Sequence, residues 1–114
     1  MSMKLTTREV SGVTIVDLSG KITLGEGGVA LREEVRKLLA EGKKKIVLNL
    51  AEVNYIDSSG LGELVSSYTA VKNAGGELKL LNLTSKVRDL LVITKLVTVF
   101  DVKDDEASAV SSFA

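Results

Sequence analysis

Apolar and polar residues follow two patterns along this chain, short β-rich runs and stripes at helical spacing. Residues 4–10 and 13–19 form two β-rich runs on either side of Ser11 and Gly12. Two residues ending in glycine between such runs predict a β-hairpin. The second run is the more apolar one, so we expect it to lie deeper in a sheet. Residues 46–50, Ile-Val-Leu-Asn-Leu, are typical of a buried parallel strand.

The stripes at helical spacing predict helices between these runs. Leu31, Val35, Leu38 and Leu39 fall on one face of a helix that Gly42 would end. A longer stripe follows residue 60 and stops before a pair of glycines. Its face comprises Leu61, Leu64, Val65, Tyr68, Val71 and Lys72.

The last part of the chain repeats the alternation in shorter elements. Residues 77–81 and 98–102 predict two further strands, and a short helix begins at Ser85 between them. The acidic residues 104–106 suit the first turn of a terminal helix, where the helix dipole favours negative charge. Phe100, like Tyr68, is expected in the core. The apolar faces of the two helices comprise Val87, Leu90 and Leu91 in the first and Ala109, Val110 and Phe113 in the second.

The order of the predicted elements is β-β-α-β-α-β-α-β-α. Strands that alternate with helices through connections of this length imply right-handed crossovers and a largely parallel sheet. The first strand joins this sheet antiparallel through the hairpin. We therefore predict an α/β fold with a four- to five-stranded, mostly parallel sheet, an antiparallel N-terminal strand and helices packed on it. One domain spans residues 1–114.

The composition excludes several kinds of catalytic group and metal ligand. The chain has no His, Cys, Pro or Trp, so thiol nucleophiles, imidazole bases and the usual zinc ligands are excluded. Lys and Arg together number 15, as do Asp and Glu, so no overall charge attracts a nucleic acid or an anionic membrane. Neither a secretory signal nor an apolar run of membrane-spanning length is present in the sequence. We expect a cytoplasmic protein that is not an enzyme.

The candidate site lies at the carboxyl edge of the predicted parallel sheet, where ligands and partners of open α/β sheets meet the strands. Three predicted loops reach this edge, at residues 20–28, 51–58 and 82–85. The middle loop leads into Tyr-Ile-Asp-Ser-Ser-Gly-Leu-Gly, residues 55–62. Its Asp and Ser residues are good helix N-caps. Two glycines in a first helical turn cost about 1 kcal/mol each, so they indicate a close backbone approach or tight packing on the sheet.

The same geometry also suits phosphorylation. A serine at a helix N-terminus lies beside free backbone N–H groups and the positive end of the helix dipole. A phosphate on Ser58 would bring a charge of about −1.5 to −2 and three acceptor oxygens. This charge would cost the domain little, but it could repel a partner or block a close contact. Ser58 would then act as a switch that changes binding and leaves the fold intact.

The segment 55–62, placed after the strand 46–50, resembles the phosphorylatable segment of the STAS-domain anti-sigma factor antagonists of bacteria. The stretch 73–81, Asn-Ala-Gly-Gly-Glu-Leu-Lys-Leu-Leu, is similar to the family's passage from helix to strand. The resemblance implies that Ser58 is the phosphoacceptor. It implies a partner that is both anti-sigma factor and serine kinase, and a PP2C-type phosphatase that resets the switch. ATP and Mg²⁺ belong to the kinase, so this chain needs no cofactor and no metal.

The resemblance and the three edge loops together define the residues expected to contact the partner. Leu61 is open to two interpretations, core or contact, and the Gly-Leu-Gly at the helix start favours contact. Thr23 stands where many members of the family carry an acidic residue, so the resemblance does not extend to the family's kinase contact at that position. The expected contact residues are Asp57, Ser59, Gly60, Leu61, Gly62, Thr23, Gly25 and Thr84.

Other functions fit the sequence less well. STAS domains also occur beside transporters, where the same edge would bind a partner without phosphorylation. An enzyme with Ser58 as its nucleophile lacks a histidine base. Residues 25–30 match G-x-G-x-x-A loosely, but a dinucleotide site needs an acid about 20 residues further on. Asp17, Asp57 and Asp101 could supply oxygen ligands for Mg²⁺, although exposed acids or a helix cap explain them more simply.

Overall fold

The computed structural model describes residues 3–25 and 27–113, and Glu26 of the predicted loop 20–28 lies outside the described residues. A five-stranded sheet runs in the order β1-β2-β3-β4-β5. Its strands are β1 (Lys4–Val10), β2 (Val13–Ile22), β3 (Lys45–Ile56), β4 (Glu77–Leu81) and β5 (Asp101–Lys103). The helices are α1 (Gly28–Ala40), α2 (Ser58–Asn73), α3 (Ser85–Ile93) and α4 (Glu106–Ser111).

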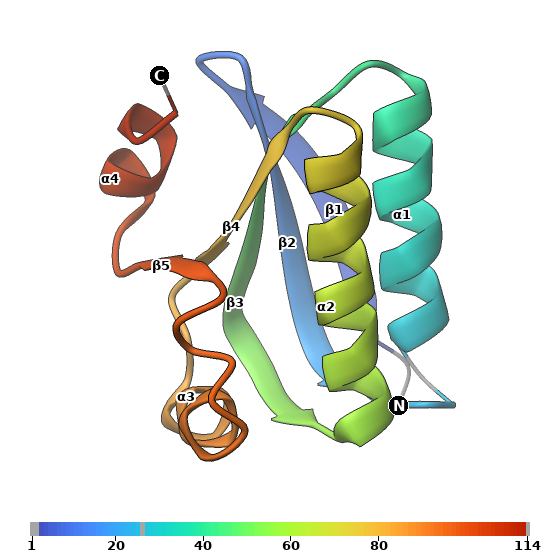
Figure 1. Cartoon of the computed structure of the whole chain (residues 1–114), viewed down its shortest axis with the longest axis vertical. Coiled ribbons are helices and arrows are strands. Elements are labelled where there is room, and N and C mark those ends of the chain that lie inside the picture. The colour runs from blue at the N-terminus through green and yellow to red at the C-terminus, as the bar shows by residue number, and fades with distance from the viewer. Residues whose placement is uncertain (1–2, 26, 114) are drawn as a thin grey trace.

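The hairpin and the mixed sheet confirm the predicted fold class. β1 pairs with β2 antiparallel, and every later neighbouring pair is parallel. Ser11 and Gly12 both have positive φ angles, 51° and 81°, as the two-residue turns that match the twist of a hairpin require. Figure 1 shows β1 and β2 joined by this turn at one end of the molecule.

The central strands are longer than the prediction, and the loop predicted at 51–58 is wrong. β3 continues from the apolar run to Ile56, and β2 continues to Ile22. The two strands stay paired because the register shifts twice, once after Asp17 and once after Gly20. Beyond these shifts, Ile22 pairs with Ile56. The carboxyl edge of β3 is therefore a sharp strand-to-helix junction, with Asp57 alone between β3 and α2.

The last strand lies further along the chain than predicted. Residues 97–100 form a turn, and β5 spans only Asp101–Lys103. The turn brings Phe100 into the core, where its ring packs edge-on against Tyr68 at a centroid distance of 5.4 Å. This contact confirms the placement of both aromatic side chains at the core. Of the predicted strand residues 98–100, only Phe100 is buried, and Val99 is 41% exposed.

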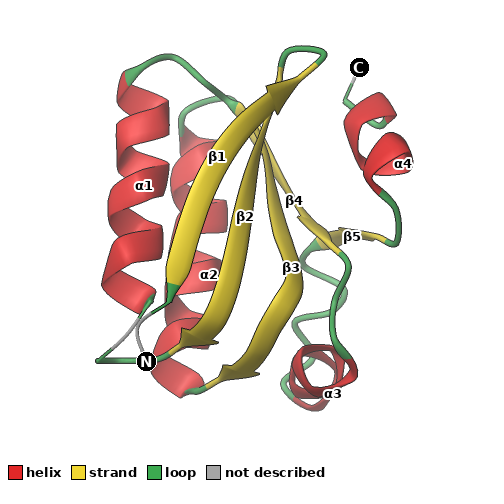
Figure 2. Cartoon of the chain, turned by 180° about the vertical axis from the view of Figure 1, so that it is seen from behind, coloured by secondary structure: helices red, strands yellow, loops and turns green. Residues whose placement is uncertain are grey.

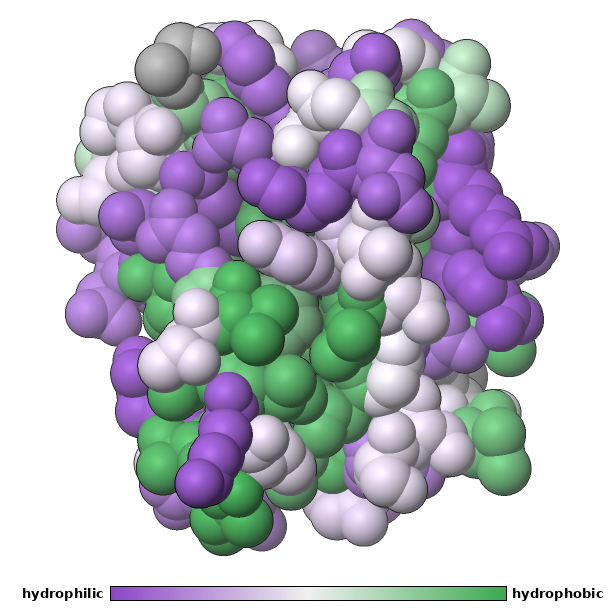
Figure 3. Space-filling view, in the orientation of Figure 1, coloured by the Kyte–Doolittle hydropathy of each residue, from purple (hydrophilic) through white to green (hydrophobic). Residues whose placement is uncertain are grey.

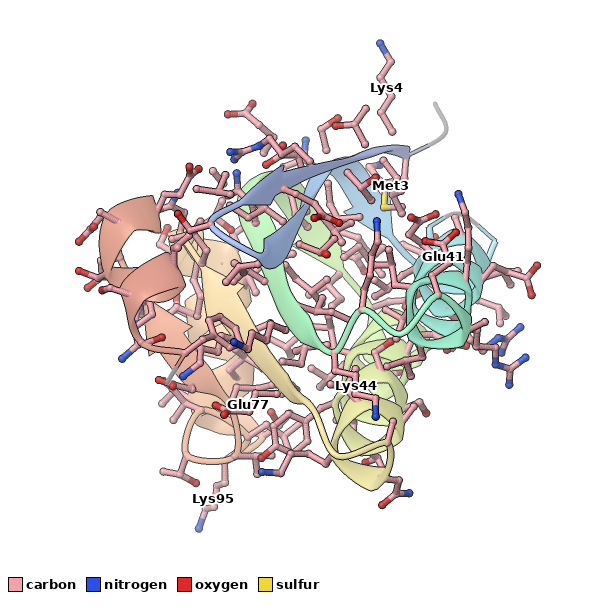
Figure 4. All side chains as sticks on the ribbon, turned by 90° about the horizontal axis from the view of Figure 1, so that it is seen from above. Met3, Lys4, Glu41, Lys44, Glu77 and Lys95 are labelled. Carbon is pink, nitrogen blue, oxygen red and sulfur yellow. The ribbon has the colours of Figure 1, made fainter. Side chains whose placement is uncertain are left out.

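Helices α1 and α2 lie next to each other on one face of the sheet, with both N-termini at the same end (Figure 1). Seen from above, side chains fill the layer between these helices and the strands, whereas Lys4 points away from it (Figure 4). The main apolar core occupies this layer. It includes the predicted helix faces, with Leu31, Val35, Leu64 and Val71 almost fully buried. Burial of these faces is the main force that holds both helices on the sheet.

The opposite face of the sheet is more open. Seen from behind, β1, β2 and β3 face the viewer, and α4 lies to one side (Figure 2). A small second core joins α4 to the strands, and Ala109 is fully buried in it. Val110 and Phe113 pack against this core, which confirms the predicted docking of the terminal helix. The apolar strand residues of this cluster are Val13, Ile15, Val47 and Leu81.

An ion-pair network fastens β1 to β2 and α4 on this open face. The guanidinium of Arg8 donates to Asp17 at 2.6 and 3.1 Å and to Glu106 at 2.6 Å. The Asn49 amide adds a hydrogen bond to Asp17 at 2.8 Å. The Arg8 guanidinium, aided by Asn49, holds the pKa of Asp17 below its ordinary value of 3.8 despite partial burial. The pKa of Glu106 is lowered by the same guanidinium.

This network predicts a pH-dependent contribution from Asp17. A carboxyl with a depressed folded-state pKa stabilises the fold above its unfolded-state pKa, and this stabilisation is lost as the pH falls through the folded-state value. We expect Asp17→Asn to lower the free energy of unfolding at about pH 7 and to approach wild type at about pH 2. Urea unfolding at several pH values measures this gap, with Glu33→Gln on the exposed face of α1 as control. A gap that is constant with pH would contradict the assignment.

Two structural observations concern membrane-spanning helices and clusters of acidic residues. Within residues 3–25 and 27–113, the structure contains no helix long and apolar enough to cross a membrane. The described acids do not gather into a group that could hold a metal ion. Asp17 pairs with Arg8, Asp101 pairs with Lys79 at 2.7 Å, and Asp57 caps a helix. The structure thus places the three candidate Mg²⁺ ligands in separate interactions.

Candidate functional site

Asp57 forms the junction between β3 and α2. Its backbone is extended, and its Oδ1 accepts a hydrogen bond from the Gly60 N–H at 2.8 Å, which is the N-cap interaction. Its Oδ2 accepts from the Leu24 N–H at 3.3 Å. One carboxylate therefore caps α2 and fixes the loop that follows β2. Of the three residues that could have capped the helix, the structure assigns the role to Asp57.

Ser58 and Ser59 open α2 and are exposed. The backbone N–H groups of a first helical turn have no carbonyl partner within the helix, and the helix dipole is positive there. The first turn of α2 contains no acidic residue that would oppose a second negative charge. The Ser58 hydroxyl therefore lies on the surface in an environment that favours a phosphate.

The two glycines of this turn have different roles. Gly60 is buried, and a Cβ atom there would overlap the Ile22 carbonyl oxygen and lie 2.7 Å from its carbonyl carbon. The start of α2 thus packs directly on the backbone at the end of β2. Gly62 is exposed, and a Cβ atom there would meet nothing within 4 Å. Close packing on the sheet explains Gly60, whereas Gly62 leaves a bare patch of helix backbone at the surface.

Leu61 corrects the expectation of an exposed contact. Its side chain is only 8% exposed and belongs to the main core, together with the fully buried Leu64. The contact of Gly60 with Ile22 fixes the rotation of α2, and this rotation turns the Leu61 side chain toward the sheet. Leu61 therefore positions the helix and offers little surface to a partner.

Thr23 and Gly25 belong to the short loop between β2 and α1. Thr23 is half-buried, pairs with Gly27 as an isolated bridge, and accepts a hydrogen bond from the Gly28 N–H at 3.2 Å. Gly25 is exposed, with open space around its Cα. Because Asp57 binds the neighbouring Leu24, this loop lies beside the start of α2. The structure thus brings Thr23 and Gly25 to the same edge as Ser58.

Thr84 has a structural role at some distance from this turn. Its hydroxyl donates to the Val53 carbonyl at 3.1 Å and accepts from the Val87 N–H at 3.4 Å, so it caps α3 and ties it to β3. Val53 precedes Asp57 by four residues along an extended strand. Thr84 thus positions α3 and lies further from Ser58 than the other expected contacts.

Exposed apolar residues around this edge were missed by the sequence interpretation. Leu24 is 76% exposed beside Asp57, and Val29 is 51% exposed in the first turn of α1. On the other side, Tyr55 is 48% and Ile93 is 77% exposed, and both line a groove of about 330 Å³. We call Leu24, Val29, Tyr55 and Ile93 the apolar rim. Figure 3 shows the apolar surface between α2 and α3.

A sequence signal existed for part of the apolar rim. Leu24 is a large apolar residue in a loop otherwise rich in glycine, where no helix or strand would bury it. Ile93 lies off the face that Val87 and Leu91 bury in α3. Exposed apolar side chains that gather at one place indicate an interaction surface.

Comparison with known proteins adds three findings. The family model described as STAS domain matches residues 4–109. The anti-sigma-B factor antagonist of Bacillus subtilis (strain 168) is 37% identical over 87 residues, which are 76% of this chain and 78% of that protein. A crystal structure of an anti-sigma factor antagonist from Mycobacterium paratuberculosis superposes with a TM-score of 0.85 at 22% identity, over 97% of this chain and 93% of the other.

A further structural neighbour is a phosphorylated protein. The Bacillus cell fate determinant SpoIIAA, in its phosphorylated form, superposes with a TM-score of 0.74 at 18% sequence identity. The superposition covers 97% of this chain and all of that chain, 100%. At this identity the likeness concerns the fold, and the phosphorylation belongs to that protein.

Proposed function

Because the chain belongs to the STAS domain family, and within it to the anti-sigma factor antagonists, we propose that it is a partner-switching regulator controlled at Ser58. Unphosphorylated, it binds an anti-sigma factor that is also a serine kinase, and a sigma factor is thereby freed. Phosphorylated, it releases the kinase. The observation that carries this proposal is the exposed hydroxyl of Ser58 at the first position of α2, directly after the Asp57 cap.

The kinase performs the chemistry in this cycle. It transfers the γ-phosphoryl group of ATP to the Ser58 hydroxyl oxygen, which loses its proton, and ADP leaves. This chain supplies only the acceptor hydroxyl, so it needs no cofactor of its own. A PP2C-type phosphatase then hydrolyses the phosphoester and restores the hydroxyl. We place both reactions in the cytoplasm, where ATP is available.

The capped helix start supports a switch that leaves the fold intact. A phosphate on Ser58 would face the N-terminal end of α2, where the dipole and the unpaired N–H groups favour an anion. The Asp57 carboxylate is already held by the N–H groups of Gly60 and Leu24. The added charge therefore changes the surface of the domain much more than its interior.

The position of the apolar rim supports the proposal that a phosphate on Ser58 releases the partner. Leu24 and Val29 lie on the α1 side of the start of α2, and Tyr55 and Ile93 lie on the side of α3. A partner that buries these side chains would also cover Ser58 between them. A phosphate in such an interface must give up its water, which costs free energy unless the partner supplies a matching cation.

The Ser58→Asp chain tests the release step. We expect its affinity for the cognate anti-sigma factor to fall about tenfold or more, because a carboxylate would occupy the centre of the interface. Calorimetric titration at physiological salt measures this change. Ser58→Asn is the matched control, because it places a side chain of nearly the same size at the same position without the negative charge.

Two results would contradict the proposed switch. One is a Ser58→Asp chain with full affinity, and the other is an equal loss for Ser58→Asp and Ser58→Asn. Copurification with membrane transport proteins, combined with no phosphate on Ser58 in cells, would favour a transport-associated STAS subunit.

A further inference from the structure

A crevice between α1 and α2 contains a group of polar side chains that the proposed switch does not use. It has a volume of about 240 Å³. Side chains from both helices form its walls. Its lining residues are Arg32, Val35, Arg36, Glu63, Ser66, Ser67 and Ala70.

Two buried hydrogen-bond donors in this crevice have no partner. Ser67 is only 3% exposed, and neither its hydroxyl nor the Arg32 Nε–H finds a hydrogen-bond partner. In the part of the chain that the structure describes, these are the buried side-chain polar atoms left unpaired. Buried polar groups in folded proteins are nearly always paired, with protein, water or ligand. The convergence of both atoms on one crevice therefore indicates an occupant.

Helix packing alone does not account for these donors. Small residues such as Ser66 and Ala70 allow two helices to approach closely, and alanine at position 67 would do so without a polar atom. A buried helical serine can donate to a carbonyl of the preceding turn, yet the Ser67 hydroxyl does not. A buried arginine Nε–H can only donate, so its partner must be an acceptor.

The charges of the crevice favour an anion. Arg32 and Arg36 bring two positive charges, and Glu63 brings one negative charge. Arg32 Nη1 donates to Glu63 Oε2 at 2.9 Å, so Glu63 occupies one edge of the guanidinium and leaves the Nε edge unpaired. Ser66 and Ser67 add two hydroxyl groups. The volume exceeds that of several water molecules at about 30 Å³ each.

From these features we propose that the α1–α2 crevice binds a small oxyanion such as inorganic phosphate. The Ser67 hydroxyl and the Arg32 Nε–H donate to its oxygens, and Arg36 neutralises the remaining charge at the open side. The site does not include Ser58, which opens α2 five residues before Glu63. The proposed anion site therefore does not depend on whether Ser58 is phosphorylated.

Titration with inorganic phosphate tests this site. In ¹H–¹⁵N NMR spectra of the full chain, recorded at constant ionic strength with chloride as the balancing anion, we expect saturable shifts of the Arg32 Nε–H and Ser67 amide signals. Ser67→Ala and Arg36→Gln should each weaken the fitted affinity about tenfold, as expected for the loss of a charge-assisted contact. Thr69→Ala, an exposed change on α2 outside the crevice, should leave it unchanged.

The outcomes separate an oxyanion site from the alternatives. Shifts that grow linearly without saturation, or that are equal in wild type, Ser67→Ala and Arg36→Gln, would overturn the proposal. Absence of any phosphate-dependent shift would overturn it as well and would leave ordered water as the partner of the two donors. Because Arg36 is exposed, the Arg36→Gln chain should fold normally even if Ser67→Ala does not.

Discussion

A Ser58→Ala chain is expected to take up no phosphate from its cognate anti-sigma factor kinase while it continues to bind that kinase. Alanine removes the acceptor oxygen and leaves the backbone of the first turn of α2 unchanged, since the side chain is exposed and the Asp57 cap does not use it. Incubation with radiolabelled ATP and the purified kinase measures the incorporated phosphate. Calorimetric titration of the same two proteins measures the affinity.

Ser59→Ala is the matched control for this experiment. Ser59 is the next residue, is equally part of the first turn and is also exposed. Its loss should leave phosphate incorporation close to that of wild type. Two results would show that Ser58 is not the phosphoacceptor. One is phosphate incorporation into Ser58→Ala equal to that of wild type, and the other is a loss of incorporation confined to Ser59→Ala.

The start of α2 was predictable because its signals are local. Asp, Ser and Gly at residues 57–60 precede a stripe of apolar residues at helical spacing, and an N-cap interaction joins residues only three apart. The hairpin was predictable for the same reason, since Ser11 and Gly12 alone adopt the positive φ angles of the turn. Such features depend on neighbours in the chain, which the sequence displays directly.

The length of β3 was not predictable in this way. Its second half, from Ala51 to Ile56, contains Glu52 and Asn54 and follows no simple alternation. These residues form strand because β2 runs beside them and two register shifts restore the pairing. Such shifts depend on contacts between distant residues, so they leave little trace in either strand's own pattern.

Leu61 shows the same limit within the candidate site. The Gly-Leu-Gly sequence indicates a bare helix start, but it does not say which side of the helix faces the sheet. The contact between Gly60 and the Ile22 backbone decides this and places Leu61 in the core. The residues left at the surface are Ser58, Ser59 and Gly62, with Leu24 and Tyr55 of the apolar rim beside them.

The Gly60→Ala chain is expected to lose at least about 2 kcal/mol of its free energy of unfolding. An added methyl group would overlap the Ile22 carbonyl, and the backbone of a paired strand cannot move aside cheaply. The higher helix propensity of alanine, worth about 1 kcal/mol, offsets only part of this cost. Urea unfolding followed by circular dichroism measures the change.

Gly62→Ala is the control that separates the clash with Ile22 from the effect of helix propensity, because it makes the same substitution two residues later in the same helix. A Cβ atom at position 62 meets open space, so we expect this chain to gain up to about 1 kcal/mol from helix propensity alone. Equal effects of the two substitutions would show that the contact with β2 does not constrain α2.

The contact between Gly60 and Ile22 also links the stability of the fold to the phosphorylation of Ser58. The Asp57 N–H donates to the Ile22 carbonyl at 3.3 Å, so lifting α2 from Ile22 should also displace Ser58 and slow its phosphorylation.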